Sequence, residues 1–226
     1  MYVVTKKLAG FTAAQNLSFI WGLPGGSFFL ASFVFGYFSS NSNGYSFLTL
    51  PTSNLEKWLS GVLIAGVLYP LIFLLFYRFI DNTFVSLYHN SLDTTDPFYK
   101  QLYESVYVFP FDGIIAWKVY PLFLFLTGAM LLGSLYFNKV AFIKVAISVC
   151  ILIIGIFGLN WAIASVLFGH ISDAGVFHYV TIPVGKEEGF IELPSYINTI
   201  FNYSIWYIFP GILWFISYTR LREKEF

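Results

Sequence analysis

The sequence has few charged residues, a single cysteine and no excess of basic over acidic side chains. Charged residues make up 11% of its 226 residues, whereas soluble proteins carry roughly 25%. Twelve basic residues balance twelve acidic ones, which leaves no basic surplus for binding nucleic acid. With Cys150 as the only cysteine, an intrachain disulfide cannot form. These shortages exclude a soluble enzyme, a nucleic-acid-binding protein and a disulfide-stapled secreted module.

Apolar and aromatic residues are abundant: they make up 58% and 22% of the chain, and the mean hydropathy is +0.72. Each of five apolar windows has about the 20 residues that an α-helix needs to cross a hydrocarbon core of roughly 30 Å. They are residues 18–38, 59–77, 119–137, 140–160 and 200–219, and the only charge among them is Lys144. The runs lack the alternation of transmembrane barrel strands. The sequence therefore predicts an all-α polytopic membrane protein, a bundle of about five to six transmembrane helices.

We expect one transmembrane domain, residues 1–226, with a short lead-in at 1–17 and external loops at 78–118 and 169–198. The predicted helices cover about 17–38, 54–77, 119–137, 140–168 and 200–219. Pro24-Gly25-Gly26 marks a weak point in the first helix, and Pro210-Gly211 should kink the last. The fourth helix exceeds the length needed, so it should tilt, protrude, or break near Gly158 or Asn160.

Charge placement indicates an orientation, although the basic residues divide evenly between the two sides. The two long loops carry nine of the twelve acids, while short basic segments occur at Lys139–Lys144 and at the C-terminus. We therefore place the 39–58 loop, the 138–144 turn and the C-terminus in the cytoplasm. Lys6 and Lys7 then fall outside, unless residues 1–17 lie on the cytoplasmic surface beside a re-entrant first helix; otherwise the chain lacks one crossing.

The clearest local motif precedes the second span. Ser53 and Glu56 have the spacing of a capping box, so a helix should begin near Ser53 and pass Trp58 along the interface into that span. We expect Glu56 and Lys57 to be exposed, with no buried role.

Residues with catalytic or metal-binding chemistry are scarce. No charge occupies the middle of a span, which argues against proton or ion coupling, and Lys144 can reach the interface. The loop histidines His89, His170 and His178, with Asp173, match no metal-ligand spacing. There is no phosphate-binding loop or nucleophile elbow. We therefore predict no catalytic residue, no metal site and no cofactor, and no ATP hydrolysis by this chain itself.

Three segments together resemble bacterial type-2 ABC transporter permeases. Residues 50–58, LPTSNLEKW, resemble the LPAS-x-x-EKF stretch of that family. Residues 132–139, LGSLYFNK, with Phe142 and Lys144, look like its second cytoplasmic turn, and residues 217–225, SYTRLREKE, resemble its C-terminal ending. The order and spacing fit over residues 30–226.

The resemblance implies a membrane-spanning permease subunit of an ATP-driven exporter in the bacterial cytoplasmic (inner) membrane. Its partners would be a cytoplasmic ATP-binding subunit and a second permease copy or homologue. A coupling helix from Ser53 to Leu59 would dock on the ATPase, with Ser53, Asn54, Glu56, Lys57 and Trp58 as partner-binding residues. Relatives usually have one more N-terminal helix.

Two other functions remain open. The chain could be a non-transporting integral membrane scaffold or anchor of a larger envelope complex, which fits the missing helix and the absence of a polar path. It could also be a membrane-embedded enzyme that uses its loop histidines. Co-purification of an ATP-binding subunit would favour the permease, and co-purification of envelope proteins alone would favour the scaffold.

Overall fold

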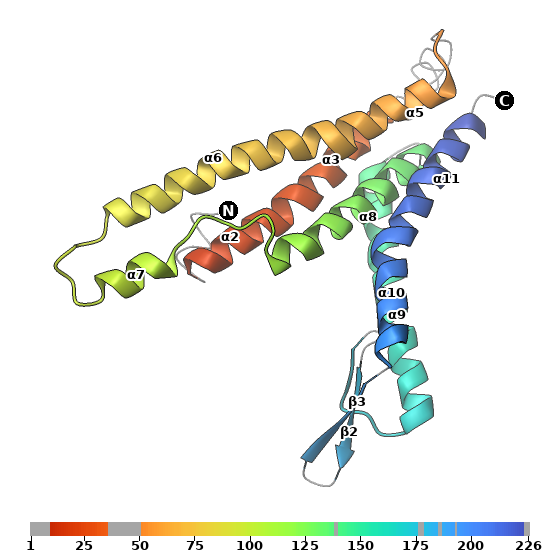
Figure 1. The fold of residues 1–226 in the computed structure, drawn as a ribbon. Coiled ribbons are helices and arrows are strands. Elements are labelled where there is room, and N and C mark those ends of the chain that lie inside the picture. Colours follow the sequence, from red (N-terminus) through yellow and green to blue (C-terminus); the bar gives the residue numbers. More distant parts are fainter. Residues whose placement is uncertain are drawn as a thin grey trace.

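The structure, a computed structural model, describes residues 10–35, 51–137, 140–175, 179–184, 187–192 and 194–223. Lys6, Lys7, the 39–44 polar patch, Lys139 and His178 lie outside these ranges. Within them, five helices are long and apolar enough to cross a membrane: Phe11–Val34, Asn54–Asn90, Ile114–Tyr136, Ala141–Phe168 and Asn198–Glu223. The prediction of a helical, multi-pass membrane protein is therefore confirmed (Figure 1).

The first span is continuous through its proline. It consists of α2 (Phe11–Ile20), the π-helical turn η1 (Trp21–Gly25) and α3 (Gly26–Val34). A wider π turn at Pro24 accommodates a residue that cannot donate the usual helical hydrogen bond, so the helix is not broken there. The span begins six residues before the predicted Leu17.

The second span is much longer than predicted. α5 (Asn54–Val62), the π-helical turn η3 (Leu63–Leu68) and α6 (Tyr69–Asn90) form one helix of 37 residues, about 55 Å long. The assignment of residues 78–90 to a loop was wrong, because they are helical. This part of the helix is amphipathic, and Tyr77, Asp81 and Val85 repeat every four residues on its buried face.

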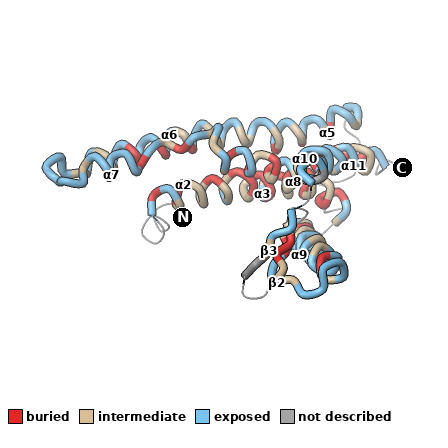
Figure 2. Tube along the Cα trace, turned by 60° about the horizontal axis from the view of Figure 1, so that its bottom comes forward, coloured by how far each residue is buried: buried red, intermediate tan, exposed pale blue. Residues whose placement is uncertain are grey.

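The remainder of the predicted 78–118 loop is short. A turn after α6 leads to α7 (Tyr99–Ser105), and an extended segment then returns to α8 (Ile114–Tyr136), which begins before the predicted Val119. α8 is the central helix and contacts α3, α9 and α11. Figure 2 shows buried positions concentrated on α2, α3 and α8, whereas α6 and α9 are mostly exposed.

α9 (Ala141–Phe168) runs unbroken past Gly158 and Asn160 and protrudes from the bundle. Only Val145 and Ala164 are buried along it. Its first residues pack against α8, and its far end carries a small antiparallel sheet of β1 (Asp173–Ala174), β2 (Tyr179–Val184) and β3 (Glu187–Glu192). Val180 pairs with Ile191 in that sheet, so the predicted loop 169–198 contains regular structure.

The last span comprises α10 (Ser195–Tyr203), the π-helical turn η4 (Ser204–Ile208) and α11 (Phe209–Glu223). The π turn immediately precedes Pro210, where the sequence predicts a kink.

The spans share an apolar core at one end of the bundle. It joins α3, α8, α9 and α11 through buried residues that include Phe35, Leu135, Val145 and Leu221, with Trp58 of α5 packed against it. We call this the α5 end. At the opposite end, the α7 end, the start of α2 packs against α6 and the segment after α7 through Phe11, Val85 and Val106.

Candidate functional site

The candidate site is the beginning of α5 and its attachment to α11. Ser53 has an extended backbone, and its Oγ accepts a hydrogen bond from the Glu56 N–H at 3.3 Å. In return, the Glu56 carboxylate accepts the Ser53 N–H at 2.9 Å. The predicted capping box is therefore confirmed. Such a cap is worth about 1 kcal/mol, and it determines where the helix begins.

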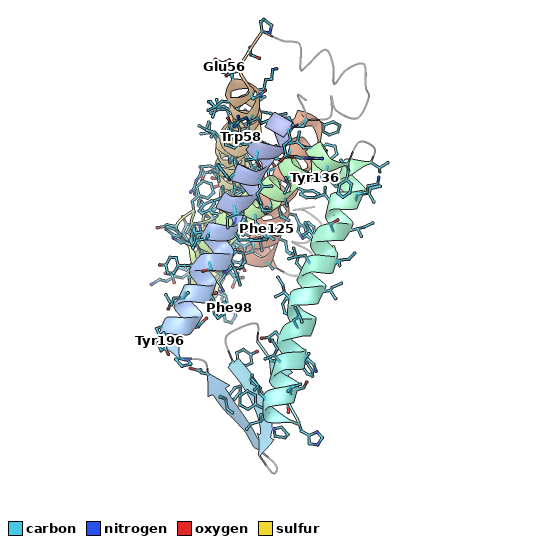
Figure 3. The ribbon with its side chains drawn as sticks, turned by 90° about the vertical axis from the view of Figure 1, so that its right-hand side faces the viewer. Glu56, Trp58, Phe98, Phe125, Tyr136 and Tyr196 are labelled. Atoms are coloured by element: carbon cyan, nitrogen blue, oxygen red, sulfur yellow. The ribbon has the colours of Figure 1, made fainter. Side chains whose placement is uncertain are left out.

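Trp58 joins α5 to the end of α11. Its indole Nε1 donates a hydrogen bond to Ser217 Oγ at 2.8 Å, and its ring meets Tyr218 edge-on at 5.7 Å between centroids. Ser217 is fully buried and donates in turn to the Trp214 carbonyl at 2.6 Å. In Figure 3, Glu56 lies at the tip of the α5 end and Trp58 lies below it, on the side of α11.

Lys57 contradicts the prediction of an exposed charge, because only 5% of the residue is exposed. Lys57 and Gly61 are the buried positions of α5, four residues apart and therefore on one face of the helix. Gly61 on that face lies against Val34 and Phe35, so a Cβ there would approach Val34 Cγ1 to 2.6 Å. Lys57 thus belongs to the inward face of the helix.

The outward face of α5 is part apolar and part acidic. Glu56 is exposed, as are Leu55 at 53% and Leu59 at 39%. Ser53 is also exposed, whereas Asn54 and Trp58 are half-buried. Of the five predicted partner-binding residues, only Ser53 and Glu56 therefore lie open at the surface, and Leu55 and Leu59 are surface residues that the prediction missed.

The charges at the α5 end are mainly basic. Arg220 forms an ion pair with Glu223 at 2.8 Å and stacks over the Tyr136 ring at 4.5 Å. Lys144 Nζ lies 5.5 Å from the centre of the Phe137 ring. Basic residues next to a short interhelical turn are typical of a cytoplasmic face.

A second polar cluster, at the α7 end, was not predicted. Asp81 is 2% exposed; its Oδ1 accepts a hydrogen bond from Gln15 Nε2 at 2.8 Å, and its Oδ2 accepts one from the Phe109 N–H at 2.7 Å. Arg78 donates to the Phe109 carbonyl at 3.0 Å, with its guanidinium 4.0 Å from the Phe111 ring centre. The Asp81 bonds attach the first span and the returning segment to α6.

Polar groups in the middle of the bundle bond to one another. The hydroxyls of Ser27 and Thr127 lie 2.8 Å apart, and both residues are fully buried. Trp214 Nε1 donates to the Leu124 carbonyl at 2.9 Å. These hydrogen bonds hold α3 and α11 against α8. The polar groups that form them have partners within the bundle and therefore have a structural role.

The described histidine-containing segments form no recognisable metal centre. No group of three His, Cys, Asp or Glu in the described residues could hold a metal ion. His89 lies against the Tyr103 ring at 3.8 Å, and its Nε2 is 2.9 Å from the Val106 carbonyl. Asp173 accepts a hydrogen bond from the Tyr179 hydroxyl at 2.9 Å, which raises the pKa of Tyr179 because the bond favours the protonated phenol.

The geometry presents a capped helix with a mixed apolar and acidic face at the α5 end of a multi-pass helical bundle. Comparison of the chain with protein-family models, curated proteins and solved structures finds no match.

Proposed function

We propose that this chain is the membrane subunit of an ATP-driven exporter and that a separate cytoplasmic ATP-binding subunit docks on the exposed face of α5. The observation that carries the proposal is the capped start of α5, which holds Leu55 and Glu56 open at the end of the bundle. The basic residues around the α8–α9 turn and the end of α11 support a cytoplasmic position for this end. The membrane is then the bacterial cytoplasmic membrane.

A separate ATPase fits the chemistry of the chain. The charged group that is buried on α6, Asp81, is bonded to Gln15 and to the Phe109 backbone at the α7 end. The central hydroxyls of Ser27 and Thr127 bond to each other. Neither pair provides a proton relay through the bundle, and the sequence has no phosphate-binding loop.

The architecture provides a route by which docking can move the spans. α5 continues without interruption into the second span, so a displacement of α5 shifts a helix of 37 residues. The Trp58–Ser217 hydrogen bond connects the same helix to the last span. ATP-driven movement at α5 would therefore reach two of the five spans directly.

Transport would take place between this chain and a second copy or a homologue. The interior of the bundle is packed, while α6 and α9 expose large apolar side chains such as Leu75, Phe76, Ile154 and Leu159. This extensive exposed apolar surface can contact a helix of the second subunit as well as lipid.

The proposal is tested by purifying the chain in mild detergent and measuring binding and turnover of the co-purified ATPase. Leu55→Ser should weaken ATPase binding about tenfold or more, since burying a leucine contributes about 1.5–3 kcal/mol. Glu56→Gln should weaken it less, because glutamine preserves the capping box but removes the charge. Glu104→Gln, an exposed acid at the α7 end, is the matched control.

The absence of any ATPase, or unchanged binding by Leu55→Ser, would contradict the proposal. Co-purification of envelope proteins without an ATPase would favour the alternative, a non-transporting scaffold subunit.

A further inference from the structure

An apolar groove lies between α8, α9 and α11. Its volume is about 360 Å³. Its lining is almost wholly apolar and includes Phe125, Ala129, Tyr136, Phe137, Val149 and Leu213. Ser148 also lines the groove, but its hydroxyl donates to the Lys144 carbonyl at 2.8 Å.

Two basic side chains, which are not themselves in the lining, each lie against an aromatic ring of the groove wall. The Arg220 guanidinium lies 4.5 Å from the Tyr136 ring centre, and Lys144 Nζ lies 5.5 Å from that of Phe137. Arg220 Nη1 bonds to Glu223, whereas its buried Nε has no hydrogen-bond partner among the described residues. The apolar groove therefore has two basic side chains beside its wall, of which Arg220 is also paired with Glu223.

The length of the groove matches one leaflet of a bilayer. Phe125 and Tyr136 both line it, and Tyr136 follows Phe125 by eleven positions along α8, which corresponds to about 16 Å. Half of a hydrocarbon core is about 15 Å. Figure 3 shows Tyr136 near the α5 end and Phe125 deeper along the same helix.

We propose that this groove binds an anionic phospholipid, with an acyl chain along α8 and the phosphate held by Arg220 and Lys144. Basic pockets between transmembrane helices at the cytoplasmic face are the usual sites for such headgroups. This inference does not depend on the exporter proposal.

The test is a lipid titration of the delipidated full-length protein, followed by native mass spectrometry. The probes are dioleoyl phosphatidylglycerol, dioleoyl phosphatidylcholine and soluble glycerol phosphate. Arg220→Gln and Lys144→Gln should each weaken phosphatidylglycerol binding about fivefold, the effect of losing one basic residue at a membrane surface. Arg222→Gln, an exposed arginine on the same helix turn, should leave binding unchanged. Ala129→Phe, which fills the groove but keeps both cations, should also weaken it.

The expected result is preferential binding of phosphatidylglycerol, which depends on Arg220, Lys144 and an open groove. Equal affinity for phosphatidylcholine, or an equal loss in Arg222→Gln, would overturn the proposal, since binding would then be unspecific. Binding of glycerol phosphate as tight as that of the lipid would overturn the role of the groove. A dimer that dissociates in Ala129→Phe, with no lipid bound to the wild type, would identify a second copy as the occupant.

Discussion

The indole Nε1 of Trp58 donates a hydrogen bond to the hydroxyl of Ser217 at 2.8 Å, across 159 positions of the sequence. The acceptor is fully buried, and the indole packs against the core that joins α3, α8, α9 and α11. Trp58 thus fixes α5, the first helix of the second span, to the last span. Trp58 therefore stabilises the packing of α5 against α11, and it also lies near the proposed docking face.

Trp58→Phe should keep most of the ring packing and lose the hydrogen bond to Ser217. We expect the free energy of unfolding to fall by about 1 kcal/mol, the usual net value of one such bond. Thermal unfolding of the purified protein measures this loss of stability. The control is Trp117→Phe, because Trp117 is 61% exposed. An equal change in both variants would contradict the assigned role.

Asp81→Asn should destabilise the α7 end. The carboxylate accepts hydrogen bonds from Gln15 and from the Phe109 N–H, and an amide would direct its NH₂ at one of these donors. A buried donor without an acceptor costs about 1–3 kcal/mol. Denaturant unfolding should show this loss in Asp81→Asn but not in Asp112→Asn, because Asp112 is exposed. Equal stability of the two variants would mean that the buried cluster does not hold this end together.

Gly133→Ala should destabilise the contact between α8 and α9. A Cβ at Gly133 would collide with Cγ2 of Val145, whose branched side chain has little freedom to move. Overpacking of this kind costs about 1–3 kcal/mol. Gly155→Ala is the matched control, since no described atom lies within 4 Å of a Cβ at Gly155 in α9. Thermal stability should fall only in Gly133→Ala, and a fall of equal size in Gly155→Ala would contradict this packing.

The orientation can be tested by thiol labelling in a Cys150→Ala background, because Cys150 is exposed. Asp93→Cys, beyond the end of α6, should react with an impermeant reagent added to intact cells. Thr52→Cys, just before α5, should react only after the cells are opened. The reverse pattern would show that the α5 end faces outward.

The helical, multi-pass class was predictable because the charges are excluded from long apolar runs, and the capping box was predictable because it is a local interaction. The extent of the second span was not. Arg78 and Asp81 resemble loop residues in sequence, but Asp81 is bonded to Gln15, 66 positions away. The four-residue repeat of Tyr77, Asp81 and Val85 was a signal that the helix continues.

The candidate site was predictable only in part, for a similar reason. Glu56 is exposed, as predicted, since its contact with Ser53 lies within one helical turn. The burial of Lys57 depends on how α5 packs in the bundle, which the local sequence does not determine. Which residues of α5 face outward is therefore known only from the structure.

The central claim, that an ATPase docks on the outward face of α5, is tested most directly by photocrosslinking. A benzophenone amino acid replaces Leu55, which is 53% exposed, or, as the control, Phe98 at the α7 end, which is 64% exposed. Irradiation of intact cells should link the Leu55 position, and not the Phe98 position, to a protein that carries an ATP-binding motif. If the Leu55 position yields only envelope proteins, or no adduct with an ATP-binding protein, the exporter account is contradicted.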